Sequence, residues 1–159
     1  MEIDRVESTN PWPYVGIYFL ATVGFSLSWG VFSYFVPSAG KSANTAVNVA
    51  IVFASTYSTY AVFVSRKGRL LERGEYWKLV SLCTAASLAY SVVSLTFFLA
   101  IGAIPGWAGM NAAFWVVVLA IGLISAFLLN AVGFSDRFGR AMLKANRARQ
   151  ARIDTETFR

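Results

Sequence analysis

The chain has 159 residues, of which 57% are hydrophobic and only 14% are charged. A soluble domain carries about a quarter of charged residues, so this composition excludes an ordinary water-soluble globular protein. The formal net charge is +6, and the chain has no His and a single Cys, which excludes His-based metal sites, a Ser-His-Asp triad and an intrachain disulfide.

Two long stretches of the chain are almost free of charge. From Leu79 to Ser135 there is no Lys, Arg, Asp, Glu or His, and from Trp12 to Ser65 only Lys41 interrupts the uncharged run. Because about 20 apolar helical residues cross a hydrocarbon core about 30 Å thick, each stretch is long enough for two crossings. The sequence predicts an all-α protein. A four-helix transmembrane bundle of two hairpins occupies residues 1–135, and a basic amphipathic cytoplasmic helix follows in residues 136–159.

The first predicted span covers residues 14–36. Pro11 and Pro13 precede it and are compatible with the first turn of a helix. Trp12 and Tyr14 have the position of an interfacial aromatic belt. These features predict that the first helix begins close to a membrane surface.

The second predicted span covers residues 42–64 and is the most polar of the four. Asn48, Ser55 and Thr59 lie near one face of this helix. In lipid such groups form hydrogen bonds with neighbouring helices, worth about 0.6 kcal/mol each on average. We therefore expect helix packing, and the alternative is a polar lining for an ion or a small solute.

The loop predicted over residues 65–78 is strongly basic. It mixes Arg and Lys with two carboxylates: Arg66, Lys67, Arg69, Glu72, Arg73, Glu75 and Lys78. Gly68 and Gly74 predict breaks in regular structure. We expect Glu72 and Glu75 to form local salt bridges rather than a catalytic pair.

The third and fourth spans are predicted over residues 78–104 and 111–133, with a break at residues 104–109. The third span has a hydroxyl-bearing face with steps of three, three, four and three residues, formed by Ser81, Thr84, Ser87, Ser91 and Ser94. Small residues allow helices to approach closely, so this face is expected to pack against another helix. Asn130, near the end of the fourth span, is expected to form hydrogen bonds within the bundle.

The tail after the fourth span has the pattern of a basic amphipathic helix. Ser135 or Asp136 could cap its start. The basic face steps by three, four and three residues through Arg137, Arg140, Lys144 and Arg147, and an apolar face contains Phe134, Phe138, Met142 and Ala145. Such a helix is suited to an anionic membrane surface.

The distribution of basic residues predicts the orientation. With four crossings, all of the 14 Lys and Arg residues except Lys41 fall on one side. The positive-inside rule therefore predicts cytoplasmic termini in a bacterial inner membrane. At about 1 kcal/mol per basic residue near an anionic leaflet, lipid or partner contacts are expected. The residues expected to make them are Arg66, Lys67, Arg69, Arg137, Arg140, Lys144 and Arg147. Nucleic acid is not an expected partner.

The layout resembles that of uncharacterised four-span bacterial inner-membrane proteins. The shared features are two hairpins and a basic cytoplasmic loop with a Gly-Arg step and a downstream Glu, here Gly68, Arg69 and Glu75. The resemblance covers most of the chain in layout and few residues in detail. It implies the fold and the location, and no activity.

The predicted spans contain no carboxylate, which argues against proton-coupled transport and aspartyl intramembrane proteolysis. The sequence favours a non-enzymatic accessory or interaction subunit without cofactor or metal, bound to a protein partner or to its own copies. One alternative is a small channel or facilitator lined by hydroxyl groups of the second and third helices: Asn48, Ser55, Thr59, Ser87 and Ser91. Another is a lipid-acting enzyme that would have to use Asn130, Glu72, Glu75 and Arg137.

Overall fold

The computed structural model describes residues 9–36, 44–102 and 111–157, and almost all of them are helical. Four helices are long and apolar enough to cross a membrane. They are α1 (Trp12–Phe35), α3 (Asn44–Lys67), α4 (Arg73–Ala100) and α5 (Ala112–Gly133), and α6 (Asp136–Thr157) follows them. The predicted all-α, four-span architecture of a multi-pass membrane protein is thereby confirmed. The predicted break at residues 104–109 lies outside the described residues, as does most of the polar leader.

The ends of the helices differ from the predicted bounds for local reasons. α3 continues past the predicted end at Val64 to Lys67, and it stops where Gly68 adopts a φ of +63°. α4 begins at Arg73 rather than at Lys78, because Glu72 has the extended conformation of an N-cap residue. The basic loop is therefore shorter than predicted and spans residues 68–72.

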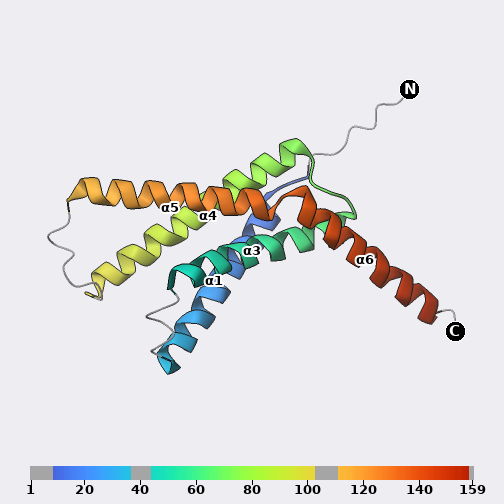
Figure 1. Cartoon of the computed structure of the whole chain (residues 1–159), viewed down its shortest axis with the longest axis horizontal. Coiled ribbons are helices and arrows are strands. Elements are labelled where there is room, and N and C mark those ends of the chain that lie inside the picture. The colour runs from blue at the N-terminus through green and yellow to red at the C-terminus, as the bar shows by residue number, and fades with distance from the viewer. Residues whose placement is uncertain (1–8, 37–43, 103–110, 158–159) are drawn as a thin grey trace.

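The four spans meet at one end of the bundle and separate at the other (Figure 1). The start of α1, the 68–72 loop and the α5–α6 corner at residues 133–137 lie together, and we call this the basic end. The opposite end, which we call the open end, holds the end of α1, the start of α3, the end of α4 and the start of α5. There the α1–α3 and α4–α5 hairpins fan apart.

The apolar core lies in the half of the bundle near the basic end. Its buried members come from α1, α3, α4 and the α5–α6 corner, and they include Tyr14, Tyr18, Tyr60, Phe63, Val64, Leu79, Val80, Cys83 and Phe134. Helix α5 packs the partly buried Phe127 and Ala131 against them. Large apolar side chains nearer the open end stay exposed, for example Phe35, Val93 and Phe97. Apolar surface of this kind is stable in a lipid environment, which does not penalise its exposure.

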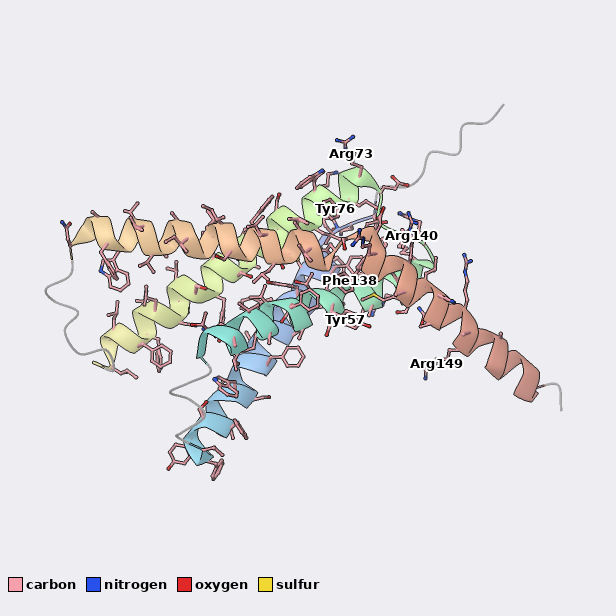
Figure 2. All side chains as sticks on the ribbon, in the orientation of Figure 1. Tyr57, Arg73, Tyr76, Phe138, Arg140 and Arg149 are labelled. Atoms are coloured by element: carbon pink, nitrogen blue, oxygen red, sulfur yellow. The ribbon has the colours of Figure 1, made fainter. Side chains whose placement is uncertain are left out.

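Helix α6 leaves the α5–α6 corner and crosses α3 before it runs away from the bundle (Figure 1). The Phe138 ring lies 5.4 Å from the ring of Phe53 on α3, and Met142 is buried. The basic residues at positions 137, 140, 144, 147 and 149 are exposed, and Figure 2 shows Arg140 on the side of α6 that faces away from α3. The first turns of the predicted amphipathic helix thus place their apolar face on α3, which differs from the expected placement on lipid.

Two glycines allow this corner to lie directly on α3. A Cβ atom at Gly133 would come within 2.6 Å of Thr56 Cγ2. A Cβ atom at Gly139 would collide with the Tyr60 hydroxyl and with a methyl group of Leu70. Close backbone approach therefore requires glycine at both positions.

Candidate functional site

Asn130 lies at the centre of a buried hydrogen-bond network that joins three helices. The Thr56 hydroxyl on α3 donates to Asn130 Oδ1 at 2.7 Å, and Asn130 Nδ2 donates to Thr84 Oγ1 on α4 at 3.1 Å. Asn130 and Thr56 have no exposed surface. The expectation that Asn130 bonds within the bundle is confirmed, and its two partners are now identified.

A second buried contact brings α1 into the same layer. The hydroxyl groups of Tyr18 and Ser87 are 2.5 Å apart, and Ser87 lies one turn along α4 from Thr84. The Thr22 hydroxyl donates to the Tyr18 carbonyl at 2.9 Å. Together these bonds lie at one level across the bundle. We define the polar layer as the five residues Tyr18, Thr56, Thr84, Ser87 and Asn130.

Above this layer, toward the open end, a groove of about 530 Å³ lies between α1, α3 and α4. We call it the open-end groove. Its lining includes small or polar residues from all three helices: Thr22, Ser26, Gly30, Asn48, Ser87, Ser91 and Ser94. Trp29, Tyr90 and Phe98 contribute aromatic surface. The groove reaches the polar layer at Ser87, where the packed half of the bundle begins.

The structure places the five predicted lining residues in two different environments. Asn48, Ser87 and Ser91 line the open-end groove. Ser55 and Thr59 are buried instead, and each hydroxyl donates to a backbone carbonyl of its own helix at 2.8 Å. A continuous row of five hydroxyl or amide groups is therefore not formed. Ser55 and Thr59 pack within α3 and its neighbours.

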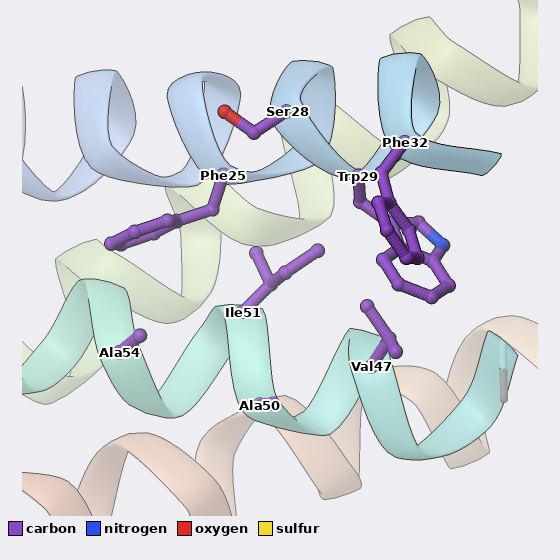
Figure 3. Close-up of a pocket in the computed structure, with 8 residues that line it drawn as sticks. All are labelled: Phe25, Ser28, Trp29, Phe32, Val47, Ala50, Ile51 and Ala54. Carbon is purple, nitrogen blue, oxygen red and sulfur yellow. The ribbon is translucent and has the colours of Figure 1, made fainter. Parts of the chain in front are cut away.

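Two further grooves open on the outer surface of the bundle. One, of about 250 Å³ between α4 and α5, shares Ser87 and Ser91 with the open-end groove and also includes Gly122 and Ala126. The other, of about 460 Å³, lies between α1 and α3 and is almost wholly apolar. Figure 3 shows Phe25, Trp29 and Phe32 of α1 facing α3, while the hydroxyl of Ser28 points away.

At the basic end, Arg69 and Glu75 form a two-point ion pair. Both carboxylate oxygens of Glu75 accept hydrogen bonds from the guanidinium at 2.7 Å. The Thr9 hydroxyl also accepts from Arg69, and the Thr9 and Glu72 backbone N–H groups donate to Glu75. The hydrogen bond with Glu75 raises the pKa of Arg69, so the guanidinium stays charged. This cluster ties the start of α1 to the start of α4.

The salt bridges expected of Glu72 and Glu75 are thereby observed. Glu72 is the weaker partner, because its carboxylate lies 3.8 Å from Arg69 and its side chain is half exposed. Asn130 belongs to the buried polar layer, so the four residues considered for a lipid-acting enzyme do not share one site. Within residues 9–36, 44–102 and 111–157, no group of three or more His, Cys, Asp or Glu side chains could hold a metal ion.

The basic residues predicted to contact lipid or a partner fall into two groups, one residue held in an ion pair and several that are exposed. Arg69 is occupied by Glu75 and also lies over the Phe63 ring, with 5.6 Å between the guanidinium carbon and the ring centroid. The other members are exposed around the basic end and along α6: Arg66, Lys67, Arg137, Arg140, Lys144 and Arg147. The sequence placed these charges on one side, and it did not distinguish the cation paired with Glu75 from the exposed ones.

Comparisons with protein-family models, with curated proteins and with solved structures found no match for this chain.

Proposed function

We propose that the protein is a non-enzymatic interaction subunit of a bacterial inner-membrane complex, and that its open-end groove receives a helix of a partner membrane protein. One observation carries the proposal. The two hairpins separate above the polar layer and leave a groove of about 530 Å³ whose lining includes small and polar residues of three helices.

The wall of this groove has the chemistry of a helix–helix interface in lipid. Gly30 and Ser26 on α1 let another backbone approach closely, and Asn48 offers an amide for a hydrogen bond between helices. Ser91 and Ser94 place hydroxyl groups on the opposite wall. A partner helix would cover groups that acyl chains leave without hydrogen-bond partners.

The close packing of the basic half of the bundle favours helix docking over the facilitated passage of a solute. A solute that entered the groove would meet the polar layer and then the core, where Tyr18, Phe63 and Val80 have 1% exposure or less. Passage would require these side chains to separate. Helix docking needs no such movement, because the groove is already open.

The charge distribution supports the proposed orientation. Arg66, Lys67, Arg73 and Arg140 are exposed at the basic end. Under the positive-inside rule this end faces the cytoplasm, with both termini on that side. The open-end groove then lies in the outer half of the membrane, and the partner helix would have to extend through that half.

The proposal is tested by filling the groove with one large side chain. Ser91→Trp places an indole in the groove, whereas Val93→Trp places it on a part of α4 that is 68% exposed. Both proteins are produced at parental levels, extracted in mild detergent and compared by native electrophoresis. We expect Ser91→Trp to release the protein from its complex and Val93→Trp to leave the complex intact.

A photo-crosslinking residue identifies the occupant. Placed at Ser94 it is expected to join the protein to one discrete membrane protein in native membranes, and Ser91→Trp is expected to abolish that product. Placed at Val93 it should give no discrete product. Selective solute flux through the purified protein in liposomes, lost in Ser91→Trp, would overturn the subunit assignment and establish the facilitator.

A further inference from the structure

A separate groove, of about 580 Å³, lies at the basic end between the start of α4 and the α5–α6 corner. Its lining combines two guanidinium groups with two aromatic rings: Leu71, Arg73, Tyr76, Trp77, Ser135, Asp136 and Arg137. Arg73 and Arg137 are far apart in sequence, and the fold brings them to one groove. Figure 2 shows Arg73 and Tyr76 at the start of α4. We call this the corner groove.

The two arginines of the corner groove differ from Arg69 in what they bind. Arg69 is paired with Glu75 through two hydrogen bonds. For Arg73 and Arg137, the described part of the chain provides no ion pair within 4.0 Å. With one carboxylate from Asp136, the groove has a formal charge of +1, which a ligand with one negative charge would neutralise.

The groove lies level with the ends of two candidate spans, where lipid headgroups are expected to meet the hydrocarbon. α4 begins at Arg73 and α5 ends at Gly133, so both ends of the candidate spans border it. Trp77 is 48% exposed, and amphipathic aromatic side chains of this kind favour the interface.

The aromatic wall of the groove is held in place by neighbouring helices. The Tyr76 hydroxyl donates to the Ala131 carbonyl on α5 at 2.9 Å. The Trp77 ring stacks on Phe127 with 6.1 Å between centroids and 15° between planes. These contacts hold the two aromatic rings against α5. The aromatic wall is therefore in place before a ligand binds.

We propose that the corner groove binds the headgroup of a glycerophospholipid with one negative charge. Arg73 and Arg137 contact the phosphate, because guanidinium groups recognise phosphate oxygens with paired hydrogen bonds. Asp136 accepts a hydrogen bond from a headgroup hydroxyl, and Trp77 covers the glycerol and the first acyl carbons. The proposal is independent of partner docking at the open end and would survive its failure.

The test counts lipids on the purified full-length protein by native mass spectrometry. The probe is phosphatidylglycerol, with zwitterionic phosphatidylcholine for comparison. The variant R73Q/R137Q removes both guanidinium groups of the groove. The matched control R140Q/K144Q removes the same charge from exposed α6 residues outside the groove. Thermal melting without lipid checks that all proteins remain folded.

We expect one phosphatidylglycerol per chain. Phosphatidylcholine should bind about tenfold more weakly, because its choline brings a positive charge to a groove with two guanidinium groups and has no hydroxyl to donate to Asp136. R73Q/R137Q should weaken phosphatidylglycerol binding about tenfold or more. R140Q/K144Q should change it by less than about twofold.

Three results would overturn the lipid site. Equal losses in the two double variants would mean diffuse attraction to basic charge. Equal binding of phosphatidylcholine would mean that the charge is not recognised. Displacement of the lipid by inorganic phosphate at equal concentration would mean a site for the free anion.

Discussion

The basic end and the open end are built from the same four helices, yet their contacts differ in kind. At the basic end, an ion pair, a buried polar layer and an apolar core join all the spans. At the open end, the hairpins separate and the groove wall holds small and polar side chains. The difference indicates that the basic half of the bundle maintains the fold and that the open half is available for binding.

The largest expected effect comes from the ion pair. Glu75→Gln removes the charge that Arg69 binds, and we expect a loss of about 2 kcal/mol in the free energy of unfolding, because hydrogen bonds between charged groups are the strong ones. The matched control Glu72→Gln should cost at most about 0.5 kcal/mol, since that carboxylate is half exposed. Denaturation of the two proteins in mixed micelles measures both values. Equal losses would show that the two-point pair has no special part in the basic end.

The α5–α6 corner should respond to a single added methyl group. Gly133→Ala introduces a Cβ close to Thr56, and overpacking of this kind costs about 1–3 kcal/mol. Gly122→Ala on the same helix meets nothing within 4 Å and should leave stability unchanged or slightly raised. Melting temperatures in detergent distinguish the two. A stable Gly133→Ala would mean that α5 does not lie as close to α3 as described.

The polar layer should contribute less than the ion pair. Asn130→Leu removes two hydrogen bonds between helices, and at about 0.6 kcal/mol each the expected loss is about 1 kcal/mol. Ser125→Leu, on an exposed part of α5, serves as the control and should have no effect. The same denaturation assay applies. A loss above about 4 kcal/mol would place the main stabilisation of the fold in this layer.

The smallest expected effect on stability is at the open end. Ser91→Trp should change the free energy of unfolding by less than about 0.5 kcal/mol, because the groove has room for the ring. Loss of the partner complex without loss of stability would sharpen the contrast between the two ends. A strongly destabilised Ser91→Trp would mean that the hairpins are packed together there.

The architecture could be predicted from the sequence because lipid imposes a simple rule on charge. The uncharged run from Leu79 to Ser135 requires two crossings, and Gly68 marks the end of a helix without further information. The start of α4 was misplaced, because Glu72 and the residues around it are charged. Hydropathy therefore assigns them to a loop although they cap a helix.

The candidate sites could be predicted only in part. The hydroxyl face of α4 was visible as a spacing of three and four residues, but the spacing does not tell which members meet another helix. Ser87 faces Tyr18, whereas Ser91 lies in an open groove. The angle between the hairpins depends on contacts between distant residues, such as Thr56 with Asn130. Arg73 and Arg137 likewise come to one groove through contacts between distant parts of the chain, and no sequence pattern predicts that they lie close together.

The separation of the hairpins is tested most directly by distances between spin labels on the reconstituted protein. With Cys83 replaced by Ala, one pair at Tyr34 and Phe97 reports on the open end, and another at Ser65 and Ser81 reports on the basic end. We predict a clearly longer distance for the first pair than for the second. Equal short distances would show that the bundle is closed at both ends, and would contradict the proposed docking groove.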